Sequence, residues 1–350
     1  TSIGQWSNLT DFPVYDLKPE RTNSFEVGMN MRFLKNFELD VTYYNAKTMN
    51  QTFNPELPVG EYARIYIQTG AVRNQGLELA LNYNNTWKDF TWNTGVTYSM
   101  NKNKILTLAD NAINPITREK FSISSLNMGG LGSTRFILKE GGSMGDIYSL
   151  MDLKRDANGA VYIDENNSVV TESLEANNYI KLGSVLPKGN LAWRNNFSWK
   201  NINVAFLVSA RLGGVVFSRT QAVLDNFGVS EASAAARDKG YVSVNGNDRV
   251  NPEGWYSVVA GGTAVPQYYI YSATNIRLQE ASIGYTIPRK WLGNVCDIKV
   301  SLIGRNLWMI YNKAPFDPES VASTDNFYQG IDYFMMPSLR NIGFNLSFKF

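Results

Sequence analysis

The sequence contains no histidine, and Cys296 is its only cysteine among 350 residues. The lack of imidazole excludes nucleophilic sites that pair Ser or Cys with a His base, and it excludes zinc sites with His ligands. One cysteine can form neither an internal disulfide nor a cysteine-rich metal centre. Only an enzyme mechanism that uses carboxylates alone stays open, so we expect a protein that is not an enzyme and has no cofactor or metal.

Positive and negative charges almost cancel, with 33 Lys and Arg against 31 Asp and Glu. The net charge of +2 provides no basic surface of the kind that binds nucleic acid, so we expect no nucleic-acid partner. Long apolar runs are missing too. The longest, such as 204–208 and 212–217, are far shorter than the roughly 20 residues of a membrane-spanning helix.

Apolar residues instead recur at every second position. From Phe25 to Phe33 the odd positions are apolar, and the same alternation runs from Ile342 to Phe350. A period of two predicts β-strands with one apolar face. The alternation predicts eleven strands, at 24–34, 37–53, 64–85, 90–103, 133–140, 144–151, 189–200, 202–217, 270–287, 295–308 and 338–350.

The second face and the connections distinguish a membrane barrel from a soluble β-sandwich. The second face carries mostly Asn, Thr, Ser and Gly, which is typical of a wet or plugged lumen. Short connections at 35–36, 86–89, 200–201 and 288–294 alternate with long ones, and aromatic residues cluster beside the short ones. Both features are typical of an all-β, transmembrane antiparallel β-barrel with its short turns in the periplasm.

The number of strands indicates that other strands complete this barrel. Bacterial single-chain barrels have even strand numbers, so eleven strands that start outside and end at the periplasm cannot close one. We expect residues 1–23 to be an extracellular loop segment and residues 24–350 to be the C-terminal part of the barrel.

Several motifs resemble those of one family. The run Leu17-Lys18-Pro19-Glu20-Arg21-Thr22, followed by Phe25-Glu26-Val27-Gly28, resembles the entry strand of the SusC/RagA-like TonB-dependent transporters of Bacteroidota outer membranes. Further stretches that resemble this family are Val41 to Asn45, Arg73 to Leu79, Ile276-Arg277-Leu278, Ile283 to Pro288, Gly304-Arg305-Asn306-Leu307, Asp317-Pro318-Glu319, and the ending from Pro337 to Phe350.

The resemblance implies the C-terminal half of a 22-stranded barrel that is plugged by an N-terminal domain. It implies active import of an oligosaccharide or a peptide, with energy from TonB, ExbB and ExbD through an N-terminal region that these residues do not include. It also implies a SusD-like surface lipoprotein that acts as a lid. A passive porin or a barrel adhesin of the outer membrane is the alternative function.

Three groups of residues are candidates for function. Inward polar residues of the early strands are expected to contact the plug, namely Glu26, Arg32, Glu38, Asp40 and Glu78. Long-loop residues that suit stacking on sugars or bonding to peptides are Trp255, Tyr256, Tyr268, Tyr269, Asn247 and Asp248. The terminal aromatics Phe348 and Phe350 resemble the signal read by the barrel assembly machinery, and the apolar face is expected to contact outer-membrane lipid.

Overall fold

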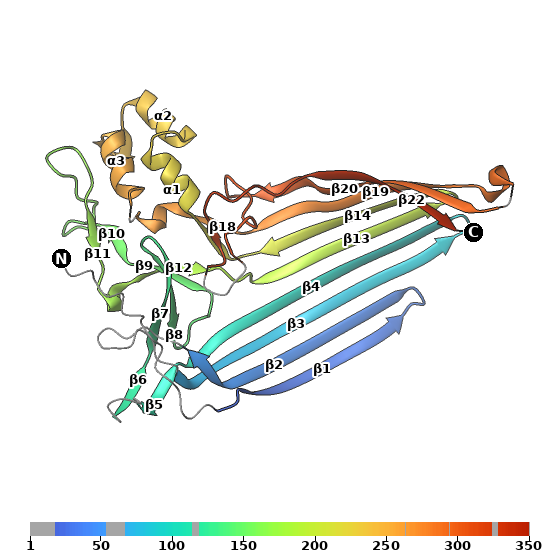
Figure 1. The fold of residues 1–350 in the computed structure, drawn as a ribbon, viewed down its shortest axis with the longest axis horizontal. Coiled ribbons are helices and arrows are strands. Elements are labelled where there is room, and N and C mark those ends of the chain that lie inside the picture. Colours follow the sequence, from blue (N-terminus) through green and yellow to red (C-terminus); the bar gives the residue numbers. More distant parts are fainter. Residues whose placement is uncertain are drawn as a thin grey trace, which may run out of the picture.

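The computed structural model describes residues 18–53, 67–113, 119–262, 264–293, 295–323 and 328–349. Long strands form one large sheet, and the other elements gather mainly at one end of it (Figure 1). We call the large sheet the wall. The elements at its end come from the connections 108–188, 213–274 and 313–340, and we call them the loop layer.

Within the described residues the wall is an antiparallel sheet of nine strands that follow one another in chain order. Its strands are β1 (Arg21–Phe33), β2 (Phe37–Phe53), β3 (Ile67–Trp87), β4 (Phe90–Thr107), β13 (Gly189–Trp199), β14 (Ile202–Leu212), β19 (Asn275–Ile287), β20 (Asp297–Asn312) and β22 (Asn341–Lys349). Connections at 34–36, 88–89, 200–201 and 288–296 lie at the end away from the loop layer, which we call the short-turn end. The predicted alternation of short and long connections is confirmed.

The register places most of the apolar side chains of the wall strands on one face. Met29 pairs with Val41 and Val41 pairs with Leu79, while near the other edge Leu302 pairs with Phe344. None of the described residues covers this face, and Phe344 is 81% exposed. Because large apolar side chains in such number are stable against lipid and not against water, this face contacts the membrane. The predicted period of two is therefore confirmed.

An aromatic belt crosses the apolar face near the short-turn end. The ring centroids of Phe33 and Phe37 are 5.3 Å apart, those of Phe37 and Tyr83 are 4.7 Å apart, and those of Tyr83 and Trp92 are 5.3 Å apart. Trp92 in turn stacks on Phe197 at 6.1 Å. Amphipathic rings favour the headgroup layer, so this belt marks the membrane interface and agrees with the predicted girdle.

Two of the eleven predicted strands do not belong to the wall. The segments predicted at 133–140 and 144–151 form β8 (Thr134–Lys139) and β9 (Asp146–Ser149), which pair in a separate sheet. β4 pairs directly with β13 instead, so nine described strands replace the eleven predicted. The physical reason is burial: every residue of β9 is buried, whereas a wall strand turns one face to lipid. Nine is also odd, so the parity argument is unchanged.

The loop layer consists of short strands and helices. Ser218, Ser230 and Asn251 cap the three α-helices that its described residues form, each by accepting a hydrogen bond from a backbone N–H of the first turn. None of the described helices has the length and apolar character needed to cross a bilayer. The elements are β5 (Ala109–Ile113), β6 (Lys120–Ile123), β7 (Ser125–Leu131), β8, β9, β10 (Met151–Leu153), β11 (Thr171–Ser173), η1 (Ala176–Asn178), β12 (Ile180–Ser184), β15 (Val215–Ser218), α1 (Arg219–Asn226), α2 (Glu231–Lys239), β16 (Val242–Val244), β17 (Asp248–Val250), α3 (Pro252–Val259), η2 (Pro266–Tyr269), β18 (Ile270–Ser272) and β21 (Ile331–Asp332), whereas η3 (Arg289–Leu292) lies at the short-turn end.

The main buried core lies in the loop layer. Phe136 comes from the first long connection, Phe217 and Val259 from the second, and Ile331 from the third, and all four belong to one buried cluster. β15 also pairs with β21 in parallel, which joins the second and third connections. The three connections therefore pack around a common core and hold one another in place.

Candidate functional site

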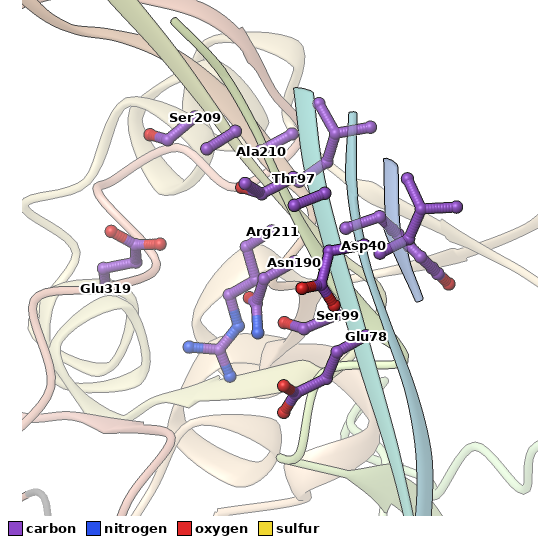
Figure 2. A pocket seen from close by; sticks show the side chains of 14 residues that line it. Asp40, Glu78, Thr97, Ser99, Asn190, Ser209, Ala210, Arg211 and Glu319 are labelled. Carbon is purple, nitrogen blue, oxygen red and sulfur yellow. The ribbon is translucent and has the colours of Figure 1, made fainter. Parts of the chain in front are cut away.

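The inner face of the wall contains a concavity of about 510 Å³. Strands β2, β3, β4, β13 and β14 line it, and Glu319 reaches it from the loop layer. Figure 2 shows Asp40 and Glu78 on one side of the concavity and the Arg211 guanidinium facing it from the other. Three carboxylates and one guanidinium make this surface suitable for polar groups that both donate and accept hydrogen bonds.

The structure places the five predicted plug-contacting residues on the inner face. Arg32 pairs across β1 and β2 with Glu38, whose Oε1 lies 3.3 Å from Nη2. Glu26 pairs with Tyr44, so it lies on the same face. The remaining two, Asp40 and Glu78, line the concavity, where Asp40 accepts a hydrogen bond from Asn30 at 3.2 Å and Glu78 makes no hydrogen bond or ion pair with the described residues.

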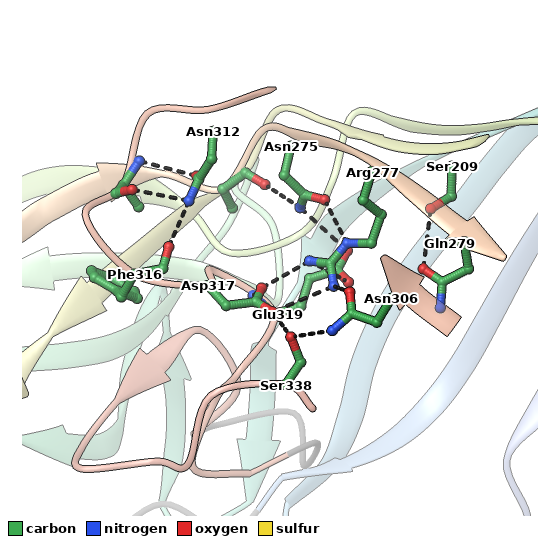
Figure 3. A network of polar contacts seen from close by, with 12 residues as sticks. Ser209, Asn275, Arg277, Gln279, Asn306, Asn312, Phe316, Asp317, Glu319 and Ser338 are labelled. Atoms are coloured by element: carbon green, nitrogen blue, oxygen red, sulfur yellow. Dashed lines mark hydrogen bonds and ion pairs between the residues drawn. The ribbon is translucent and has the colours of Figure 1, made fainter. Parts of the chain in front are cut away.

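A buried arginine connects the wall to the loop layer (Figure 3). Arg277 on β19 is 4% exposed, and its Nη2 lies 2.8 Å from Oδ1 of Asp317 and 3.2 Å from Oε2 of Glu319. Its Nε donates to Asn275 at 3.3 Å, and its Nη1 donates to Asn306 at 3.2 Å. A buried guanidinium is stable only when such partners surround it, so the network fixes where the third connection meets the wall.

Asn306 and Ser338 complete this network. Asn306 has a φ of 52°, and it lies where β20 has an irregular register with β19. Such bulges redirect side chains, and here the Asn306 amide donates to Ser338 Oγ at 2.8 Å. The Ser338 hydroxyl donates to Asp317. Both ends of the connection 313–340 are thereby fastened to the same point of the wall.

The network also sets the charge of Asp317. Burial favours the neutral acid, but the hydrogen bonds from Arg277, from Ser338 and from the Glu319 backbone hold the pKa of the Asp317 carboxyl below its ordinary value. Asp317 is therefore ionised at neutral pH. Since Glu319 follows two residues later, the same contacts hold its carboxylate beside the concavity.

In the sequence, four of the residues at this site belong only to family-like motifs: Arg277, Asn306, Asp317 and Glu319. No sequence pattern marks Arg211. The structure brings all of them together on the inner face of the wall, where the wall meets the loop layer. One signal in the sequence points to the contact: an arginine on a wall strand requires a carboxylate partner, and the acidic motif 317–319 follows in the next long connection.

Three of the predicted ligand residues lie in or near the helices of the loop layer. The rings of Trp255 and Tyr268 meet edge to face with centroids 5.2 Å apart. Tyr256 lines a second cavity, of about 540 Å³, between α1, α2 and α3, which we call the helix cavity. Burial, and then the nearby Asp225 carboxylate, raises the pKa of the Tyr256 phenol, which therefore stays a neutral hydrogen-bond donor at physiological pH.

The other three predicted ligand residues do not line the helix cavity. Tyr269 is 2% exposed and donates to Asp225 Oδ2 at 3.0 Å, so it belongs to the core and does not face a ligand. Asn247 and Asp248 lie in the hairpin of β16 and β17, and neither lines the helix cavity. Asp248 accepts a hydrogen bond from Asn245 at 2.9 Å, which orients Asn245 toward the Val161 backbone.

The remaining predicted features concern the last strand and metals. Phe348 lies on the lipid face, where it pairs with Ile298 and is 51% exposed. Phe350 lies outside the described residues. Its role, and that of Phe348, as an assembly signal stay predictions. In the described part of the chain, no group of three His, Cys, Asp or Glu side chains is arranged to hold a metal ion.

Known sequences relate this geometry to TonB-dependent receptors. A family described as TonB dependent receptor-like, beta-barrel, matches residues 2–204, which is more than half of the chain. TonB-dependent receptor P3 of Formosa agariphila is 26% identical over 98% of this chain, and receptor P26 of the same organism is 27% identical over 95%. The chain spans only 35% and 34% of these two relatives.

Solved structures show the same fold. The RagAB peptide importer in the closed-closed state superposes with a TM-score of 0.70 at 17% identity, over 95% of this chain and 35% of that one. The open-open state gives 0.66 at 17% identity, over 96% and 35%. This fold agreement confirms the resemblance to RagA-like barrels that the motifs indicated. With the match over residues 2–204, it follows that the chain belongs to the TonB-dependent receptor-like β-barrel family and forms part of an outer-membrane barrel.

Proposed function

We propose that the protein containing this chain actively imports an oligosaccharide or a peptide across the outer membrane, as a SusC-like transporter driven by TonB. The observation that carries the proposal is the buried Arg277 network, which joins an ordered loop layer to a polar concavity on the inner face. A barrel that only lets solutes diffuse through does not need loops fastened in one position at its entrance. A transporter that selects its cargo needs such fixed loops, because specificity depends on groups held in place.

The inner concavity is proposed as a contact of the plug. Asp40 and Glu78 present carboxylates, and Arg211 presents the opposite charge across from them. Glu26, Arg32 and Glu38 extend the polar face toward the edge strand β1. Polar contacts of this kind are more easily exchanged for water than an apolar interface, which suits a plug that must move during transport.

The cargo is proposed to meet the loop layer first. The Trp255 and Tyr268 ring pair offers apolar faces, and Tyr256 beside Asp225 offers a phenol donor next to an acceptor. This combination suits either a sugar ring or a peptide. The solved relative with the same fold is described as a peptide importer, which supports the peptide class.

A SusD-like lipoprotein is proposed as the partner that covers the loop layer. Phe227 and Val229, between α1 and α2, are 73% and 68% exposed, and Phe227 lines the helix cavity. Exposed large apolar residues in a surface turn mark contact surfaces. A lid that rests on them would close the helix cavity from outside.

Uptake by cells tests this function. Cells with and without the gene would be given labelled oligopeptides and oligosaccharides at low concentration, in backgrounds with and without TonB. We expect loss of uptake of one cargo class when either the gene or TonB is deleted. Uptake that continues without TonB would indicate a passive porin, and unchanged uptake without the gene would contradict import and leave the adhesin alternative.

A single substitution tests the role of the loop residues in cargo binding. Trp255→Ala is expected to weaken cargo binding about tenfold, because it removes one ring from a stacking surface. Tyr162→Ala is the control, since Tyr162 is an exposed aromatic of the loop layer whose ring lies against Lys154 and not against the Trp255 and Tyr268 pair. Equal effects of both substitutions on the concentration that half-saturates uptake would contradict the assignment.

A further inference from the structure

The short-turn end repeats one arrangement of residues: an aromatic side chain beside a cation. Every described short connection has it, and so does the last strand. The neighbouring residues are Phe33 and Lys35, Trp87 and Lys88, Trp199 and Lys200, Trp291 and Lys290, and Phe348 and Lys349. The aromatic members belong to the side of the wall that meets the membrane interface, so the cations lie just beyond that interface.

The backbone at three of these lysines is unusual. Lys35, Lys88 and Lys200 have φ values of 63°, 54° and 50°, and they are the only described lysines with positive φ. In the turns 88–89 and 200–201 the positive φ falls on the first residue alone, which is the pattern of a type II′ turn and favours glycine there. Lysine is less favourable than glycine at this position, so the conformation does not by itself account for the lysines.

Backbone hydrogen bonds align the turns on one rim. The Lys200 N–H donates to the Asp89 carbonyl at 3.0 Å, and the Thr286 N–H donates to the Asn201 carbonyl at 2.8 Å. The turn lysines are exposed at this end of the wall.

The rim carries excess positive charge. Lys35 and Lys88 make no ion pair with any described residue, and Lys200 Nζ has only a ring contact, 5.3 Å from the Trp199 centroid. Of the two carboxylates in the described short turns and their flanks, Asp89 stands alone and Asp297 lies 3.8 Å from Arg289. Four turn lysines (Lys35, Lys88, Lys200 and Lys290) and one arginine therefore face two carboxylates, and the free lysines can take an outside anion.

We propose that these lysines form a cationic rim that binds the headgroups of anionic phospholipids in the periplasmic leaflet of the outer membrane. The aromatic belt holds the wall at the depth of the headgroups, and each lysine then lies at the level of the lipid phosphates. A headgroup with a net negative charge, such as phosphatidylglycerol, gains from this rim, whereas a zwitterionic one gains little. The import function does not depend on this inference, nor does the inference depend on import.

Lipid selectivity tests the rim. The full-length transporter would be placed in vesicles of phosphatidylcholine, and the association of spin-labelled phosphatidylglycerol would be compared with that of spin-labelled phosphatidylcholine. We expect about threefold or greater preference for phosphatidylglycerol, falling as salt is added. In the variant K35N/K88N/K200N the ratio is expected to fall close to one.

The choice of asparagine as the replacement distinguishes an effect on lipid binding from an effect on folding. It tolerates positive φ better than lysine, so the triple variant is expected to melt at the same temperature as the parent or above it. The control K139N/K154N/K239N removes three lysines of the loop layer, each of which lies over a Tyr ring, and is expected to keep the ratio. An unchanged ratio in the rim variant, or an equal fall in the control, would overturn the proposal. So would displacement of the labelled lipid by an equal concentration of inorganic phosphate, which would show a site for free anions.

Discussion

The wall and the loop layer of this chain place their apolar side chains in opposite ways. Phe344 on the wall is 81% exposed, whereas Phe136 in the loop layer is 0% exposed. The wall is a single sheet whose outer face needs lipid, while the loop layer packs three distant connections around its own core. The two regions therefore depend on different surroundings, and Arg277 is where they are joined.

The largest expected effect comes from a pair of Phe substitutions. Phe136→Ala is expected to lower the free energy of opening of the loop layer by about 3–5 kcal/mol, because it leaves a cavity in a packed core. Phe344→Ala is expected to change the stability of the wall by about 1 kcal/mol or less, since lipid fills the space. Native-state proteolysis of the full-length protein in vesicles measures both. Similar losses for the two variants would mean that the contrast between the regions is wrong.

A pair of arginine substitutions tests the joint between the regions. Arg277→Ala leaves Asp317 and Glu319 without their buried cation, so we expect a loss of about 3–5 kcal/mol. The control is Arg305→Ala. Arg305 lies 3.0 Å from Glu280 on the same two strands, but its side chain is 69% exposed. There the loss should be about 1 kcal/mol or less.

The readout for this pair is cleavage within the connection 313–340. Faster cleavage in Arg277→Ala and unchanged cleavage in Arg305→Ala are expected, because only Arg277 contacts that connection. If Arg277→Ala leaves the cleavage rate unchanged, the network does not fasten the loop layer to the wall.

Adjacent positions on β20 test the two faces of the wall. Leu302→Arg puts a charge on the lipid face and is expected to cost about 2–4 kcal/mol if the residue lies near the bilayer midplane. Ile303→Arg puts the same charge on the inner face, where the expected cost is about 1 kcal/mol or less. Denaturant unfolding of the full-length protein in vesicles compares the variants. A larger loss for Ile303→Arg would reverse the assignment of the faces.

The same contrast explains what the sequence could predict. Lipid on one side of the wall and a polar lumen on the other force a period of two, so the strands and the inward positions of Asp40 and Glu78 followed from alternation. β9 is buried on both faces and lacks a membrane pattern of its own, so its assignment to the wall was wrong. Arg211 and Glu319 line the same concavity only because the connection 313–340 folds back onto β19, and no local sequence pattern encodes that return.

The smallest expected effect is a pH dependence confined to the loop layer. Burial, followed by the Asp225 carboxylate and its hydrogen bond, raises the pKa of the Tyr269 phenol far above its ordinary value near 10. The unfolded chain loses this proton above about pH 10, while the folded layer keeps it. The free energy of unfolding of the loop layer is therefore unaffected below about pH 10 and falls by about 1.4 kcal/mol per pH unit above it. Native-state proteolysis between about pH 9 and pH 11 would detect the decline. Tyr269→Phe should remove it, whereas Tyr162→Phe, which alters an exposed phenol, should not; a decline that persists in Tyr269→Phe would assign it to another group.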